Sequence, residues 1–289
     1  MFPSENLGLA VVDGLVNGSV IAFIALGLAI VFGIMNVVNL THGELYMFGA
    51  MISWLLVQAA LPYASALVVA PLLVGGLAVV INMLILQRFE HEPGQTVLAT
   101  FGLLLIMQQV GLAVLGPAPR SIPPPFNPII EFSGFSYSGF KLLAGMISLA
   151  ASLLVWIGVE RSRIGPLLRA AQENRLMAES LGINTSRVFM IGFVLAGSLV
   201  GLAGALTSPF RQIHFLMGFD ALAMSFVVVV LGGVGRIGGT IAAGVALGLL
   251  ESLAALFLAP TVARVLTLTL ALIYIVARRL GSVKGVWRY

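Results

Sequence analysis

Residues 160–187 read ERSRIGPLLRAAQENRLMAESLGINTSR and form the one long polar stretch in an otherwise apolar chain. This stretch holds five of the 15 Lys and Arg residues of the protein. Basic stretches between membrane spans are typical of the cytoplasmic side, because Lys and Arg are retained there during insertion. If residues 160–187 are cytoplasmic, the direction in which each neighbouring segment crosses the membrane follows by alternation.

Within this stretch the pattern predicts one short helix over Gly165–Ile183. Pro166 falls at its expected first position and Gly182 just beyond its end, where these residue types commonly start and stop helices. Leucine and alanine give the helix an apolar side, and Arg, Gln and Glu give it a polar side. An isolated helix of this length is marginal in water. Two interpretations stay equally open: a loop lying on the bilayer surface, or a docking element for a separate soluble protein.

Composition identifies an integral membrane protein. Hydrophobic residues make up 60% and charged residues 9% of the 289 residues, whereas about a quarter of the residues in a soluble domain are charged. The net charge of +4 does not indicate a nucleic-acid partner, because the basic residues lie at the expected membrane edges rather than in one patch. The chain has no cysteine, so disulfides and thiolate metal sites are excluded. We expect residues 1–289 to form a single transmembrane domain in the lipid bilayer, with loop 160–187 cytoplasmic.

The apolar runs predict an all-α polytopic bundle of about eight or nine transmembrane segments, with broken or re-entrant helices. A spanning helix needs about 20 mostly apolar residues. The Pro-rich residues 116–138 are too kinked for us to expect regular structure there. The predicted segments are Gly8–Ile34, His42–Ala60, Tyr63–Leu86, Thr96–Leu115, Phe140–Val159, Val188–Ser208, Ala221–Leu231, Thr240–Leu258 and Thr261–Ala277.

The segment Ala221–Leu231 is only about half a membrane long, and a glycine-rich stretch ends it. We expect the chain to reverse there, with Gly232, Gly233, Gly235 and Gly239 forming a re-entrant turn that protein or water covers. Reversal leaves 11 Lys and Arg residues inside and four outside, a bias that favours it over one continuous helix. The N-terminus is then predicted outside and the C-terminus inside. The residues expected outside are Arg120, Lys141, Arg211 and Arg264.

The polar break between the first two spans contains a carboxylate, Glu44, that follows Asn36, Asn39, Thr41 and His42. A carboxylate within hydrocarbon is costly, so it usually faces a partner or a wet cavity. One interpretation is an interfacial cluster that caps the helix beginning near Thr41 or His42. The other is that these residues line a translocation path, where transporters often place the ends of broken helices. The two interpretations are compatible.

Glu251 lies near the middle of the predicted span Thr240–Leu258. One interpretation is a buried structural pair with Arg264 or Ser252, and the other is a place in the translocation path. Glycines spaced four apart, at 197 and 201 and at 244 and 248, are typical of close helix packing in membranes.

Motifs for catalysis and for ATP binding are absent from the sequence. The glycine-rich turn lacks the Gly-Lys-Ser/Thr ending and the strand-to-helix context of a phosphate-binding loop. There is no paired-carboxylate motif for a magnesium diphosphate, no His-Glu-x-x-His and no Gly-x-Ser-x-Gly. We expect no metal site in this chain and no enzymatic activity.

Three stretches resemble one family. Residues 27–51, GLAIVFGIMNVVNLTHGELYMFGAM, resemble the N-terminal signature of bacterial branched-chain amino-acid ABC transporter permeases. Residues 168–184, LRAAQENRLMAESLGIN, are similar to the cytoplasmic loop of that family, and residues 230–239, VLGGVGRIGG, to its glycine-rich turn. The three matches follow in the order and spacing of the family and frame nearly the whole chain.

The resemblance implies a permease subunit of an importer in the bacterial inner membrane, with a periplasmic N-terminus and a cytoplasmic C-terminus. Its partners would be a homologous second permease, two cytoplasmic ATP-binding subunits and a periplasmic solute-binding protein. ATP and magnesium would be bound by the ATP-binding subunits, with no cofactor in this chain. The resemblance also places the Asn36–Glu44 break in the core of the pathway and favours the docking interpretation of loop 166–183. Its docking residues would be Arg169, Ala170, Glu173, Ala178, Leu181 and Gly182.

The sequence also departs from the family. After Gly165 it reads Pro-Leu-Leu-Arg, where many relatives have Gly-Arg-x-x-Arg, so one basic contact is in doubt. Residues 172–178 are also similar to the branch that transports urea and short amides. The cargo therefore stays open between branched-chain or hydrophobic amino acids and urea, short amides or aromatic acids. A proton-coupled secondary transporter acting through Glu44 or Glu251 is the alternative from another class.

Overall fold

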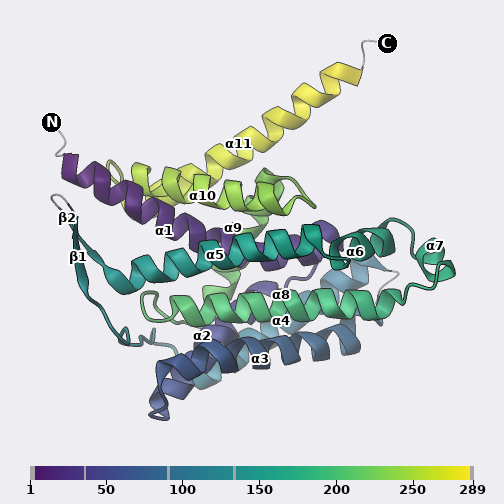
Figure 1. The fold of residues 1–289 in the computed structure, drawn as a ribbon, viewed down its shortest axis with the longest axis horizontal. Coiled ribbons are helices and arrows are strands. Elements are labelled where there is room, and N and C mark those ends of the chain that lie inside the picture. Colours follow the sequence, from purple (N-terminus) through teal and green to yellow (C-terminus); the bar gives the residue numbers. More distant parts are fainter. Residues whose placement is uncertain (1–3, 36, 90–91, 133–134, 287–289) are drawn as a thin grey trace.

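The computed structural model describes residues 4–35, 37–89, 92–132 and 135–286, which form a helical bundle with a small β-hairpin (Figure 1). Two helices continue into short π-helical segments, η1 (Ala29–Ile34) and η2 (Asn82–Leu86). The α-helices of the described residues are α1 (Ser4–Leu28), α2 (His42–Gln58), α3 (Tyr63–Ile81), α4 (Pro93–Leu115), α5 (Gly139–Arg161), α6 (Ile164–Glu173), α7 (Arg175–Ser180), α8 (Thr185–Thr207), α9 (Met217–Gly232), α10 (Ile237–Ala254) and α11 (Pro260–Val286).

Seven helical segments among the described residues are long and apolar enough to span a membrane, which confirms an all-α polytopic membrane protein. Helices α2 and α9 are shorter, with 17 and 16 residues. Helix α2 covers most of the predicted span His42–Ala60, and α9 contains the predicted segment Ala221–Leu231. The seven segments are Asn6–Gly33, Tyr63–Leu86, Gly94–Leu115, Gly139–Arg161, Thr185–Thr207, Ile237–Ala254 and Pro260–Ala277.

The bundle has two ends, which we name the hairpin end and the α7 end (Figure 1). The β-hairpin and the beginning of α1 lie together at the hairpin end, because a Cβ on Gly8 of α1 would lie 2.8 Å from the ring of Phe135 in the hairpin. Helix α5 runs from the hairpin to α6 and α7 at the other end, and the C-terminal end of α11 points the same way. The described helices thus place the N-terminal and C-terminal parts of the chain at opposite ends.

The centre of the bundle is α1, which packs along α10 in the antiparallel sense. A Cβ on Gly14 would lie 2.9 Å from the Cα of Leu249, and one on Gly244 would lie 2.7 Å from the Cα of Ala22. Backbones this close leave no room for larger residues, as expected for small residues in membrane helices. The glycines predicted to pack closely do so: a Cβ at 197, 201, 244 or 248 would approach a neighbouring helix to 2.3–2.7 Å.

The chain breaks between η1 and α2, as predicted. Helix α2 does not begin at the end of the bundle. Its first residue, His42, packs against Gly27, because a Cβ on Gly27 would lie 2.8 Å from the imidazole of His42 and 2.6 Å from Val200. Gly27 and Val200 belong to the inner parts of α1 and α8, so α2 begins inside the protein. The break therefore carries polar residues into the bundle.

The Pro-rich residues 116–138 contain regular structure, contrary to our prediction. Strands β1 (Ile129–Phe132) and β2 (Phe135–Ser138) pair antiparallel, with Ile130 opposite Tyr137. The prolines all precede β1, so both strands keep their backbone donors for the ladder. Arg120 also exchanges two backbone hydrogen bonds of 2.8 Å with Ile213.

The loop predicted to form one helix over 165–183 forms two, α6 and α7. Asn174 separates them with extended backbone angles, and its side chain accepts a hydrogen bond from the Met177 backbone to start α7. Asparagine competes with helix continuation in this way. Pro166 is the third residue of α6 rather than the first. Gly182 does terminate the helix as predicted, at φ +82°, and Ile183 donates to the carbonyl of Ala178 in a Schellman motif.

The chain reverses at the glycine-rich turn, as predicted. Gly233 and Gly235 have positive φ angles of +95° and +82°, and helices α9 and α10 on either side pack together. A Cβ on Gly232 would lie 2.5 Å from the backbone of Gly239. The turn lies at the α7 end, because Gly238 packs on the indole of Trp156 near the end of α5.

Candidate functional site

The polar break is folded into the protein rather than placed at a surface. Asn39, Thr41, His42 and Glu44 are each no more than 1% exposed, and Asn36 lies outside the described residues. The Asn39 side chain accepts hydrogen bonds from the Thr41 backbone at 3.0 Å and hydroxyl at 2.6 Å. Thr41 precedes α2 without a side-chain hydrogen bond to the helix. Helix α2 begins at His42 with Glu44 in its first turn, as the cap interpretation expected, but these residues are buried rather than interfacial and Thr41 supplies no side-chain cap.

Glu44 lies in the first turn of α2 and faces two other helices. Its Oε1 atom accepts a hydrogen bond of 3.1 Å from the Gln108 amide of α4. Its Oε2 atom has no partner among the described residues and would lie 2.6 Å from a Cβ on Gly218. The Nε2 atom of buried His42 also has no partner among them. Unpartnered buried polar atoms are uncommon and often mark functional regions.

A cavity of about 240 Å³, which we call the charged cavity, lies close to Glu44, because its lining includes Tyr46 of α2 and Met217, the residue before Gly218. Its lining contains two arginines, two carboxylates and a histidine beside an apolar wall. Arg211, His214, Glu251 and Arg264 are half-buried. The full lining is Ile21, Ile24, Tyr46, Arg211, Gln212, His214, Met217, Asp220, Ala221, Met224, Ser225, Glu251 and Arg264.

Glu251 does not form the structural pair that we considered. The Ser252 hydroxyl donates to the Ala10 carbonyl at 2.7 Å instead. Arg264 lines the same cavity as Glu251, yet these two described residues form no ion pair with each other, whereas Lys141 and Asp13 do form one. Glu251 and the arginines therefore face the cavity with their charges uncompensated by one another at contact distance.

An adjoining cavity of about 290 Å³ extends the charged cavity toward the hairpin end and shares Arg211 and Glu251 with it. Asp13 lines this second cavity, where it accepts a hydrogen bond of 2.9 Å from the Tyr137 hydroxyl and pairs with Lys141. Burial, followed by the negative charge of Asp13, raises the pKa of the Tyr137 phenol. Tyr137 therefore keeps its proton and stays a hydrogen-bond donor.

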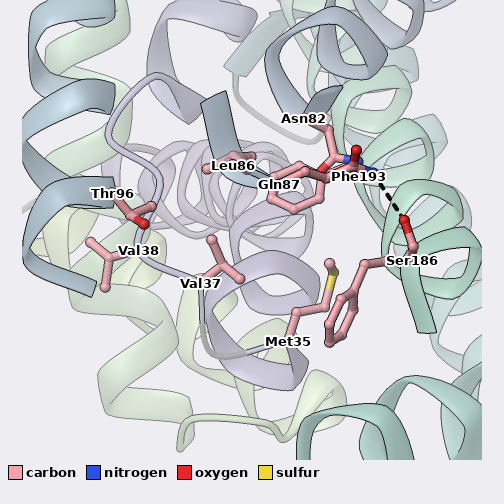
Figure 2. A pocket seen from close by; sticks show the side chains of 10 residues that line it. Met35, Val37, Val38, Asn82, Leu86, Gln87, Thr96, Ser186 and Phe193 are labelled. Atoms are coloured by element: carbon pink, nitrogen blue, oxygen red, sulfur yellow. Dashed lines mark hydrogen bonds between the residues drawn. The ribbon is translucent and has the colours of Figure 1, made fainter. Parts of the chain in front are cut away.

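A smaller cavity of about 90 Å³ lies at the α7 end, between the residues that follow η1, segment η2 and the beginning of α8 (Figure 2). The break supplies Met35, Val37 and Val38 to its wall, and the Gln87 amide donates to the Ser186 hydroxyl at 3.1 Å beside it. π-Helical turns are frequent at functional sites. The break therefore turns its polar residues toward the bundle interior and its apolar residues toward this cavity.

The predicted docking segment lies on the surface at the α7 end. Arg169, Ala170, Glu173, Leu181 and Gly182 are exposed, whereas Ala178 is buried. Three large apolar side chains of this segment are also exposed: Leu176 is 79%, Leu181 75% and Met177 63% exposed.

The structure brings together residues that the sequence left apart. Glu251 shares a cavity with Arg264, which we had considered as its partner, and with Arg211 and Asp220, which we did not assign to a site. Gln108 was also missed as the partner of Glu44. One signal was available: Gln108 is a polar residue in the middle of a predicted span, where polar groups usually have a partner. Arg211, Asp220 and Arg264 gave no such signal, because each lies in a loop or near the end of a predicted segment.

Comparison with known proteins gives a consistent result. The family model described as the permease component of branched-chain amino acid transport systems matches residues 10–277. The chain is 29% identical over 287 residues to the high-affinity branched-chain amino acid transport system permease protein LivH of Salmonella typhimurium, covering 93% of this chain and 92% of that protein. It is equally similar to LivH of Escherichia coli K12. It is 26% identical over 260 residues to BraD of Pseudomonas aeruginosa, covering 84% and 85%. No solved structure matches the chain.

Proposed function

The chain belongs to the family of branched-chain amino acid ABC transporter permeases, and on this premise we propose that it is one permease subunit of an ATP-driven importer. The family comprises transport permeases and not enzymes. A homologous permease would complete the translocation path in the bacterial inner membrane. Two cytoplasmic ATP-binding subunits would hold ATP and magnesium, and a periplasmic solute-binding protein would deliver the amino acid. The α7 end would face the cytoplasm and the hairpin end the periplasm.

The observation that carries this proposal is the exposed apolar face of α7. Leu176 and Met177 on α7 and Leu181 just after it leave large apolar side chains uncovered, where this short helix projects from the bundle (Figure 1). A short helix with such a face is well suited to lie in a groove of a partner protein. A position on the cytoplasmic side agrees with a partner that hydrolyses ATP there.

Helix α6 connects this face to the interior. Its Leu168 is fully buried, and a Cβ on Gly192 of α8 would lie 3.1 Å from Leu168 and 2.8 Å from the sulfur of Met35. Met35 immediately precedes the polar break that leads to α2. A displacement of α7 by a closing ATP-binding subunit would therefore press on the break through packed side chains, as a rigid-body coupling requires.

The test is copurification of the tagged chain with the ATP-binding subunits encoded beside it. We expect Glu173→Arg to abolish both copurification and amino-acid uptake, because it reverses a charge on the docking face. Glu92→Arg is the matched control, since Glu92 is exposed at the same end but outside the segment. Normal copurification and uptake by the Glu173→Arg protein would overturn the docking assignment.

Gly182 offers an independent test of the same surface. Gly182→Arg places a large charged side chain at a positive φ angle beside Leu181, whereas Gly182→Asn keeps the angle with little strain. We expect the first substitution to abolish uptake and the second to retain most of it. Equal loss in both would assign the effect to backbone strain rather than to docking.

One observation favours a second candidate, a proton-coupled transporter. Glu44 is fully buried and has one oxygen without a partner among the described residues, which is a common arrangement in proton relays within membranes. Purified chain in liposomes, without ATP-binding subunits, distinguishes the two. Uptake driven by a proton gradient would favour this candidate, and uptake only with the subunits and ATP would favour the importer.

A further inference from the structure

The charged cavity contains both signs of charge around one small space. Arg211 and Arg264 come from the segment before α9 and from α11, and Glu251 comes from α10. Asp220 adds a second carboxylate at the exposed side. Only 9% of the residues in this chain are charged, and ionised groups inside a membrane protein are costly unless they serve a function. The clustering of four such residues therefore needs an explanation.

Internal ion pairing does not supply that explanation. Among the described residues that line the charged cavity no ion pair is formed, and Lys141 and Asp13, which do form one, lie outside its lining. No hydrogen bond joins Glu251 to Arg211 or Arg264 in the described part of the chain. Half-buried charges that converge on a cavity are suited to a ligand that compensates them.

The ligand must carry both signs. A neutral urea or amide would leave the arginines and carboxylates uncompensated, and a simple acid would leave Glu251 without a counter-charge, which is costly in a half-buried site. One wall of the cavity is apolar and consists of Ile21, Ile24 and Met224. The volume of about 240 Å³ is just below that of pockets for drug-sized molecules, so a smaller ligand fits.

We propose that the charged cavity binds a free α-amino acid as its zwitterion. Arg211 and Arg264 face the α-carboxylate, Glu251 faces the α-ammonium group, and the apolar wall receives the side chain. A carboxylate recognised by guanidinium groups forms the strong, directional contacts expected of charge-assisted hydrogen bonds. The inference rests on the proposed function in one respect, since it places this cavity in the translocation path.

The experiment measures thermal unfolding of the detergent-solubilised complex at increasing ligand concentration, because a ligand that binds the folded state raises the unfolding temperature. The probes are leucine, its deaminated analogue isocaproate, its decarboxylated analogue isoamylamine, and urea. We expect leucine to stabilise the complex and the other three to have little effect. Stabilisation by urea, or by isocaproate as strong as by leucine, would overturn the proposal.

Glu251→Gln and Arg264→Gln test the two halves of the site. Each should weaken the apparent leucine affinity about tenfold or more, because each removes a charged partner of the ligand. Glu131→Gln, an exposed carboxylate of β1 outside both cavities, is the matched control and should leave the affinity unchanged. If Glu251→Gln keeps the full response to leucine, the assignment is wrong. If neither cavity variant folds, the four ligands on the natural chain decide the question.

The outcomes separate this inference from the proposed function. A complex that contains the ATP-binding subunits and imports leucine, but whose stability does not respond to leucine, would retain the importer and reject the cavity. Loss of the subunits with a retained, Glu251-dependent leucine response would reject the importer and retain the ligand class.

Discussion

Single glycines set the distance between the central helices. A Cβ on Gly248 would lie 2.3 Å from the Cα of Gly18, so the backbones of α10 and α1 touch there. Gly102 of α4 has open space instead, with no atom within 4 Å of such a Cβ. The same residue type therefore has opposite roles at the two positions. Gly248 permits the backbones of α10 and α1 to touch, whereas Gly102 makes no such contact and only lowers the stability of its helix.

We predict that Gly248→Ala destabilises the protein by about 1–3 kcal/mol, because an added methyl group meets backbone atoms that cannot rotate away. Gly102→Ala should be neutral or slightly stabilising, since alanine favours a helix over glycine by about 1 kcal/mol. Thermal unfolding of both proteins in the same detergent measures the difference. Equal stability of the two would show that α1 and α10 can separate without loss.

At the scale of elements, α2 is the unusual helix because it begins inside the bundle. Its first turn carries Glu44, and the single hydrogen bond from Gln108 ties it to α4. Tyr46, two residues after Glu44 on α2, forms a hydroxyl–hydroxyl hydrogen bond of 2.7 Å with Thr207 at the end of α8. Polar contacts of this kind fix the position of a helix that apolar packing alone would let slide.

We predict that Gln108→Leu lowers the stability of the protein by about 1–3 kcal/mol, because it leaves the buried Glu44 carboxyl without a described partner. Gln109→Leu is the matched control: the neighbouring residue is of the same type but exposed on the same helix. Unfolding midpoints of the two variants provide the measurement. A midpoint for Gln108→Leu no lower than that of Gln109→Leu would mean that the bond contributes nothing.

At the scale of the whole molecule, charge and shape agree on two distinct ends. The β-hairpin, Arg120, Lys141 and Arg211 lie toward one end, where the sequence predicts the outside. The glycine-rich turn and α6–α7 lie at the other, with most of the basic residues (Figure 1). The arrangement fits the positive-inside rule with the α7 end in the cytoplasm.

Because the chain contains no cysteine, single introduced cysteines report this orientation without background. We predict that Ser136→Cys on β2 reacts with a membrane-impermeant thiol reagent in cells whose outer membrane is permeabilised. Ser180→Cys on α7 should react only after the inner membrane is opened, and both positions are exposed in the fold. The unmodified chain is the control. The reverse labelling pattern would invert the topology and, with it, the proposed docking side.

The sequence alone determined the class of protein, nine apolar segments of which seven are long enough to span a membrane in the structure, the break before His42, the reversal at Gly233 and Gly235, and the family. These features are local: hydropathy, turn chemistry and motif order are all readable along the chain. It also showed where α7 ends, because only a residue like Gly182 adopts the required φ angle easily.

Only the tertiary structure decided which residues meet. Glu251, Arg211 and Arg264 lie in separate segments, and nothing in their spacing shows that three elements converge on one cavity. The partner of Glu44 and the burial of His42 likewise follow from α2 beginning inside the bundle. The physical reason is that hydrophobicity drives each helix into the membrane but does not select its neighbours. Between helices in lipid, that selection is made by close contacts of small residues and by a few polar bonds.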